Sequence, residues 1–193
     1  MEQHLPQGVI SAREEFFYPD MTVGVLPETL RIVMPRNGQP GVQLLLETEE
    51  KWLEVSLESD AFEPEFFCMK AIPVEYNTGD GIDQDGPMVL EQRPEQKPEY
   101  ATRLAPFEVF DCLKPAPDGV IEAKYGRAAV YICLRPRRNL TKGSYTATLH
   151  AGAYRCQLIV QVYATEIPQD SFPVTNWFSL DAICRFHGLR KDT

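Results

Sequence analysis

A chain of 193 residues with 44% hydrophobic and 24% charged side chains has the composition of an ordinary globular protein and the length for one generous domain. The formal net charge is −9, and the acidic excess lies in residues 1–100, which hold 20 acidic and 7 basic side chains. Such a field repels phosphate backbones, and the basic cluster of Arg135, Arg137, Arg138 and Lys142 is short and free of aromatics, so we expect no nucleic-acid partner.

Hydropathy and cysteine usage bear on the compartment. No stretch approaches the ~20 apolar residues of a membrane span, and the N-terminus lacks the basic start and apolar run of a signal peptide. We therefore expect a cytoplasmic protein without a membrane partner. The cysteines are odd in number, lie far apart and form no CxxC pair, which predicts buried free thiols; they are Cys68, Cys112, Cys133, Cys156 and Cys184.

The first clear strand signals lie between residues 42 and 76. Apolar residues alternate with polar ones over 42–46, a turn follows at Glu49-Glu50, and the alternation resumes over 52–57, which predicts a hairpin. A longer strand is expected over 65–76, where Pro73 indicates a sheet edge or a bulge. The segment 77–98 is rich in turn formers and carboxylates, and a loop of this length is the first place to look for a binding surface.

Strand patterns return over 103–115, 127–136, 143–151 and 153–164, and the last two predict the clearest hairpin of the chain. One face of that hairpin is expected to be buried and the other solvated. The buried set is Tyr145, Ala147, Leu149, Tyr154, Cys156, Leu158, Val160 and Val162, and the solvated set includes Arg155, Gln157 and Gln161. The pattern predicts an all-β fold, a two-sheet antiparallel β-sandwich of immunoglobulin-like or jelly-roll-like type.

The last residues break the strand pattern. Leu180, Ile183, Cys184 and His187 follow helical spacing, with Ser179 placed as N-cap, which predicts a helix over 179–188. We expect residues 1–167 to form a β-sandwich accessory domain and residues 168–193 to be a linker and the truncated start of a following domain.

Motifs for chemistry are weak. The acidic stretch Asp80, Asp83, Asp85 and Gly86 does not fit an EF-hand, because a glutamine stands where the bidentate glutamate belongs. The histidines His4, His150 and His187 stand in unrelated contexts, and no phosphate loop, nucleophile elbow or HExxH motif occurs. We expect no catalytic residue, no metal and no cofactor in this chain.

Four segments, taken together and in order, resemble one family. They are YNTGDG at 76–81, APFEVFDCLKP at 105–115, LTKGSYTATL at 140–149 and PVTNWFSLDAICRFHGL at 173–189. They resemble the N-terminal part of family-123-type glycoside hydrolases and their uncharacterised relatives, in which a β-sandwich precedes a (β/α)8 catalytic barrel. The resemblance implies that the C-terminal strand and helix open that barrel, and that the full-length protein hydrolyses N-acetylhexosamine-type or related glycosides with acids of the barrel.

On this resemblance the chain is a non-catalytic accessory domain whose partner is the downstream barrel of the same polypeptide. Asn176, Trp177 and Asp181 are then the residues that could approach a substrate, because barrel enzymes work at the ends of their strands. Two alternatives remain open. A carbohydrate-binding module would show a row of exposed aromatics, for which Trp52, Tyr76, Tyr131 and Tyr163 are candidates, and a protein-interaction sandwich would use the acidic loop.

Overall fold

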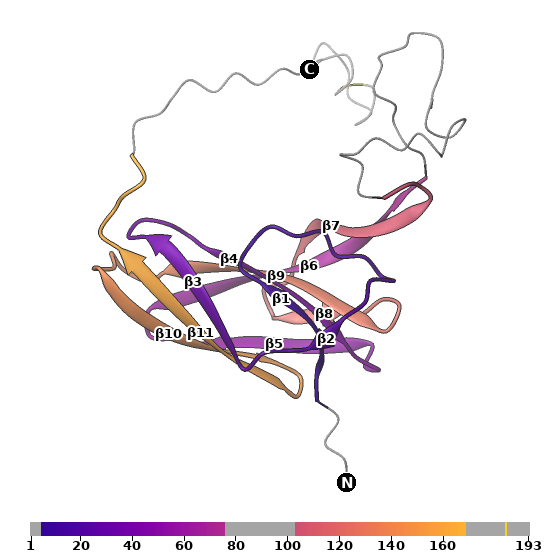
Figure 1. Cartoon of the computed structure of the whole chain (residues 1–193), viewed down its shortest axis with the longest axis horizontal. Helices are drawn as coiled ribbons and strands as arrows, with labels where there is room; N and C mark the ends of the chain where they lie inside the picture. Colours follow the sequence, from indigo (N-terminus) through magenta and orange to yellow (C-terminus); the bar gives the residue numbers. More distant parts are fainter. Residues whose placement is uncertain (1–4, 76–102, 169–183, 185–193) are drawn as a thin grey trace.

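The computed structural model describes residues 5–75, 103–168 and 184, and these form two β-sheets packed face to face (Figure 1). The first sheet has six strands in the order β2 (Gly24–Val25), β1 (Gln7–Ser11), β4 (Gly41–Glu47), β9 (Arg127–Pro136), β6 (Phe62–Val74) and β7 (Phe107–Pro115). The second has five, in the order β3 (Thr29–Pro35), β11 (Tyr154–Tyr163), β10 (Gly143–Ala151), β5 (Trp52–Glu58) and β8 (Val120–Glu122). The predicted all-β sandwich is confirmed.

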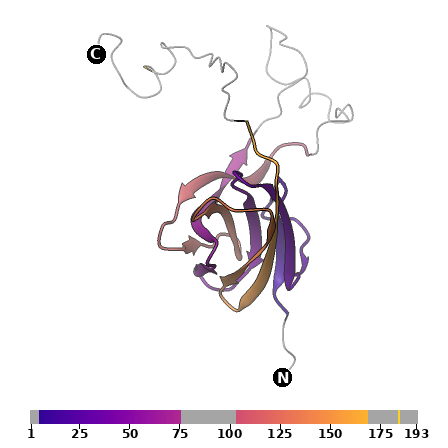
Figure 2. The same cartoon turned by 90° about the vertical axis from the view of Figure 1, so that its left-hand side faces the viewer.

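The two sheets enclose a central space (Figure 2), and alternate side chains of both sheets form the main core there. On β9, for example, the side chains of Ala128, Val130, Ile132 and Leu134 are all fully buried. Successive side chains of a strand point to opposite faces, so this spacing of two places the apolar set on one face. Burial of these large side chains, at about 25 cal/mol per Å² of apolar surface, is the main favourable contribution to the fold.

The hairpin of β10 and β11 forms in the predicted register. Ala151 pairs with Tyr154 across a two-residue turn at Gly152 and Ala153, and the pairing continues to Gly143 and Val162. The predicted inner face is buried, except that Tyr145 is half-buried at its rim. Arg155 and Gln157 are exposed as expected, whereas Gln161 is only half-exposed because its side-chain amide donates a hydrogen bond to the carbonyl of Gly143 at 3.1 Å.

The predicted hairpin between residues 42 and 57 is wrong. Both segments are strands, but β4 pairs with β1 and β9, whereas β5 pairs with β10 and β8. The short connection between them crosses from one sheet to the other. Val42 and Leu53 therefore point into the core from opposite sheets, whereas in a hairpin they would lie on the same sheet. Alternation of apolar and polar residues shows which face of a strand is buried. The pattern is the same whether the next strand pairs with it in a hairpin or crosses to the other sheet.

The five-stranded sheet is mixed, within a sandwich that is mostly antiparallel as expected. β3 pairs with β11 in parallel, from Thr29 opposite Gln157 to Pro35 opposite Tyr163. The other pairings in both sheets, among the described residues, are antiparallel. The expected strand over 65–76 is β6, and Pro73 lies where β6 pairs with β7 alone, past an irregularity between Lys70 and Ala71. The edge-or-bulge expectation for Pro73 is confirmed.

Several expectations fall on other parts of the chain. The acidic loop over 77–98 and most of the helix expected over 179–188 lie outside the described residues; Cys184, which is described, is helical and buried. Of the cysteines expected to be buried thiols, Cys68, Cys156 and Cys184 are buried and Cys133 is half-buried. Cys112 is exposed, which corrects the expectation of buried thiols, because it lies on the edge strand β7, where the alternation no longer separates a core face from a solvent face.

Candidate functional site

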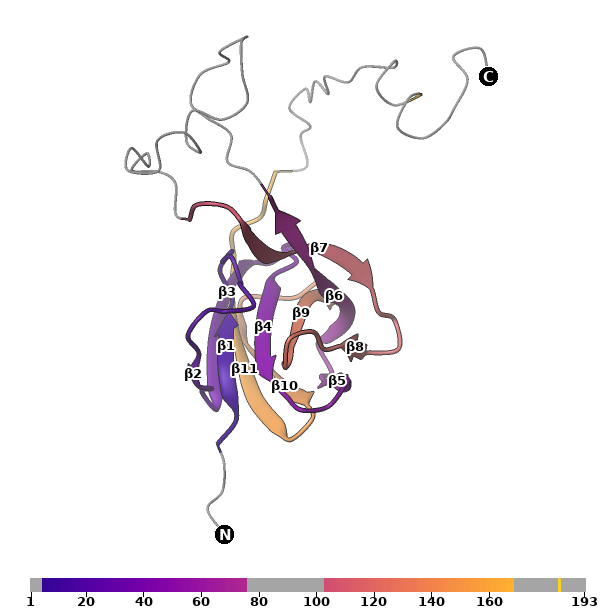
Figure 3. The same ribbon diagram turned by 90° about the vertical axis from the view of Figure 1, so that its right-hand side faces the viewer.

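A second, smaller core lies on the outer face of the six-stranded sheet (Figure 3). Residues 12–23, which we call the strap, run over this face between β1 and β2. Phe17 is fully buried against Phe110, whose backbone N–H donates to the carbonyl of Phe17 at 2.8 Å. Two residues earlier, the backbone N–H of Glu15 donates a hydrogen bond to Oε1 of Gln43 on β4 at 2.8 Å. The strap thus covers part of this face of the sheet and makes its surface uneven.

The strap borders a hollow of about 390 Å³, which we call the strap hollow. Its floor includes the ring of Tyr131, which lies so close over Gly41 that a Cβ there would come within 2.3 Å of the tyrosine hydroxyl oxygen. Only glycine permits that approach. Phe16, Glu14 and Asp111 line the rim. Burial raises the pKa of Tyr131, so its hydroxyl stays protonated and can donate a hydrogen bond.

A second hollow, of about 490 Å³, lies further along the same strap and is called the tip hollow. It is built by three parts of the chain that are distant in sequence: the end of the strap, the residues that enter β7, and the turn that joins β8 to β9. Its lining residues are Pro19, Asp20, Arg103, Pro106, Phe107, Glu108 and Tyr125.

Arg103 organises one side of the tip hollow. Its guanidinium donates hydrogen bonds from both terminal nitrogens to the two carboxylate oxygens of Asp20, one of them at 2.7 Å. The same guanidinium lies 5.0 Å from the ring centroid of Tyr18 and 5.3 Å from that of Phe107. Hydrogen bonding to Arg103 holds the pKa of Asp20 below its usual value. A bidentate pair stacked on aromatic rings has little freedom to reorient.

Lys124, Glu108 and Tyr125 form the other side. Lys124 Nζ lies 3.2 Å from Oε1 of Glu108 and 4.6 Å from the centroid of the Tyr125 ring. The neighbouring side chain of Tyr125 and, after it, Lys124 lower the pKa of Glu108. Glu108 is therefore ionised at neutral pH and suits hydrogen-bond acceptance better than proton donation.

The tip hollow combines aromatic rings with two ion pairs whose charges cancel, an arrangement that can bind a ligand through stacking and hydrogen bonds. No group of three or more His, Cys, Asp or Glu side chains able to hold a metal ion occurs within residues 5–75 and 103–168 or at 184. The same residues contain no helix long and apolar enough to cross a membrane.

The residues singled out from the sequence are not brought together here. Asn176, Trp177 and Asp181 lie outside the described residues, as do His4, His187, Tyr76 and the acidic cluster at Asp80, Asp83 and Asp85. His150 is half-buried on β10, with Nε2 3.6 Å from a carboxylate oxygen of Glu58.

The row of exposed aromatics that a carbohydrate-binding module would show does not form among the described candidates. Trp52 and Tyr163 are half-exposed on the outer face of the five-stranded sheet, but at its opposite ends. Trp52 lies beyond the level at which Val55 pairs with Ala151, near the β10–β11 turn, whereas Tyr163 is the last residue of β11. Tyr131 lies on the other sheet, beneath the strap hollow.

Sequence reasoning missed the tip hollow altogether. Asp20 and Arg103 are 83 residues apart, and nothing in their local sequences links them. One signal was available: between the strand patterns of β8 and β9 the chain reads Lys124-Tyr125-Gly126-Arg127, a turn with tyrosine where asparagine or aspartate is usual.

Comparison with known proteins gives a fold likeness. No protein-family model matches the chain, and no curated protein matches it in sequence. A solved structure of a family 123 glycoside hydrolase from Clostridium perfringens, described in connection with glycolipid glycan hydrolysis, matches with a TM-score of 0.54 at 12% identity. The match covers 83% of this chain and 28% of that one, so this chain spans less than a third of the enzyme's length. This likeness shows that the sandwich has the fold of a part of a family 123 glycoside hydrolase.

Proposed function

We propose that this chain is a non-catalytic accessory domain of a larger glycoside hydrolase that acts on N-acetylhexosamine-type or related sugars. The observation that carries the proposal is the asymmetry of the structural match. Most of this chain, 83%, is superposable on 28% of a much longer sugar-hydrolysing protein. A sandwich that occupies a minor part of such a protein suits a supporting role beside a separate catalytic domain.

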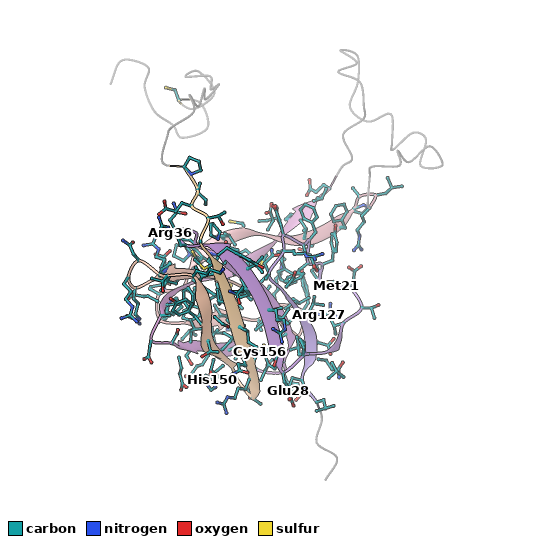
Figure 4. The ribbon with its side chains drawn as sticks, turned by 60° about the vertical axis from the view of Figure 1, so that its left-hand side comes forward. Met21, Glu28, Arg36, Arg127, His150 and Cys156 are labelled. Carbon is teal, nitrogen blue, oxygen red and sulfur yellow. The ribbon has the colours of Figure 1, made fainter. Side chains whose placement is uncertain are left out.

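The way the chain leaves the sandwich supports this role. After β11, residues 164–167 stay fixed to the end of β3. The side chain of Asn37 both donates to the carbonyl of Ile167 and accepts from its backbone N–H, each at 2.8 Å, and Arg36 forms an ion pair with Glu166. We call these contacts the exit clamp. Arg36 lies at the end of the sandwich from which residues 164–168 depart, opposite Glu28 and His150 (Figure 4). These contacts hold residues 166 and 167 against the end of the sandwich.

The chemistry of the tip hollow agrees with a role other than catalysis. Asp20 and Glu108 are each paired with a cation and have lowered pKa values, so neither is a ready proton donor at neutral pH. A general acid for glycoside hydrolysis needs the opposite shift.

The test is a comparison of two proteins in hydrolysis of aryl N-acetylhexosaminides. One is residues 1–193, and the other is the polypeptide encoded by the natural reading frame, extended past Thr193 as far as that frame runs. We expect turnover from the longer protein and none above a buffer blank from residues 1–193. A reading frame that stops at Thr193, or turnover by residues 1–193 that a point substitution within them abolishes, would contradict the proposal.

A further inference from the structure

The turn between β8 and β9 places tyrosine in a backbone conformation that tyrosine rarely adopts. Lys124 and Arg127 pair through two backbone hydrogen bonds, at 2.8 and 3.1 Å, and enclose a two-residue turn. Both central residues have positive φ, 58° at Tyr125 and 72° at Gly126. This is the signature of a type I′ turn. Its first central position favours asparagine, aspartate or glycine, because in the left-handed region a Cβ comes close to the following carbonyl oxygen.

Core burial does not account for the choice of tyrosine. Tyr125 is 57% exposed and belongs to neither hydrophobic core of the sandwich. The left-handed backbone conformation is unfavourable for a residue other than glycine. A local rule broken without a gain in packing is a mark of a functional position.

The surroundings hold this exposed ring in place. Lys124 Nζ lies 4.6 Å from the ring centroid and is itself 3.2 Å from Oε1 of Glu108. Across the hollow, Phe107 is fixed beneath the Arg103 guanidinium, which is itself fixed by Asp20. The tip therefore presents a rigid aromatic surface bordered by hydrogen-bonding groups, which reduces the ordering cost of binding a ligand.

We propose that the tip hollow binds a neutral pyranose ring of a glycan, with the apolar C–H face of the sugar stacked on Tyr125. The sugar hydroxyls then lie within reach of Asp20, Glu108 and Lys124, which offer both acceptors and donors. Asp20 and Glu108 balance Arg103 and Lys124, so a charged ligand would have to disrupt an existing ion pair, whereas a neutral polyhydroxylated one would not. A hollow of about 490 Å³ lies within the ~300–1,000 Å³ range of small-molecule sites.

This binding does not depend on the accessory role proposed above, because it requires only the described sandwich. The probes are the methyl glycosides of glucose, galactose and their 2-acetamido forms, titrated into ¹⁵N-labelled residues 1–193 and followed by NMR chemical shifts. We expect millimolar binding of at least one of them, with shifts centred on residues 103–108 and 124–127.

The decisive variant is Tyr125→Asn, because asparagine suits the turn. We expect this protein to keep or raise its Tm while its affinity falls at least tenfold, which separates loss of the ring from loss of the fold. Tyr125→Trp should retain binding, since it keeps a flat aromatic face. The matched control is Trp52→Ala, which removes a similarly exposed aromatic from the other sheet and should leave binding unchanged.

Three results would overturn the proposal: shifts from none of the four glycosides, binding that Tyr125→Asn leaves intact, or shifts centred on Trp52 or on the strap hollow. None of these results bears on hydrolysis by the longer polypeptide, so the two proposals fail separately.

Discussion

Replacement of Leu158 by alanine tests the packing of the main core. Leu158 is fully buried in the middle of β11, opposite Leu30 of β3 and Ala147 of β10. A Leu→Ala change in a core costs roughly 2 to 5 kcal/mol, depending on how far the neighbours collapse into the space. Ala147 is too small to fill it, and both flanking strands are hydrogen-bonded in place. We therefore expect a loss of about 3 to 5 kcal/mol in the free energy of unfolding.

Urea denaturation followed by tryptophan fluorescence and far-ultraviolet circular dichroism gives this quantity, with thermal unfolding as a check. For a domain of this size the loss corresponds to a Tm lower by roughly 6 to 20 °C. Gln157→Ala is the matched control, because the neighbouring side chain of the same strand is exposed and should change stability by less than about 0.5 kcal/mol. A similarly small effect of Leu158→Ala would refute the assignment of faces in the β10–β11 hairpin.

Three further predictions concern other parts of the molecule. In an NMR titration the pKa of the Asp20 carboxyl should lie below the ordinary aspartate pKa and return toward it in Arg103→Gln. Because the folded pKa is the lower one, the ionised carboxylate stabilises the folded protein at neutral pH. This stabilisation is lost as the pH falls from the ordinary aspartate pKa through the folded pKa. Tyr154→Phe should cost about 0.5–1.5 kcal/mol in urea denaturation, because the hydroxyl donates to the carbonyl of Pro27 at 2.7 Å; an unchanged midpoint would show that water replaces this bond without loss. Deletion of residues 169–193 should leave a single cooperative unfolding transition, since the last core strand ends at Tyr163, and loss of cooperativity would place the domain boundary further along the chain.

The tip hollow shows how little of a binding site local sequence carries when the site is assembled from distant segments. Asp20, Phe107 and Tyr125 come from the strap, an edge strand and a turn, and only Tyr125 is unusual in its own segment. The aromatic residues that did stand out as candidates, Trp52 and Tyr163, prove to be far apart on one sheet. A ring's exposure depends on what packs over it, and that is a property of the whole fold.

The sequence by itself predicts seven strands of the sandwich but not β1, β2, β3 or β8. The alternation over β10 and β11 predicts both the hairpin and its buried side, because the two strands are joined by a short turn and pair with each other by proximity. The same period of two on β4 and β5 predicts their buried faces, with Val42 and Leu53 pointing into the core.

Only the tertiary structure decides which strands become neighbours when other pairings are open. β4 and β5 belong to different sheets, and β3 joins β11 in parallel across more than a hundred residues of chain. The physical reason is that a side chain's burial depends on its own hydrophobicity, which the local sequence carries, whereas a strand's partner depends on the competition among all edges of the two sheets. The pairing that is adopted buries Val42 of β4 and Leu53 of β5 in one core between the two sheets.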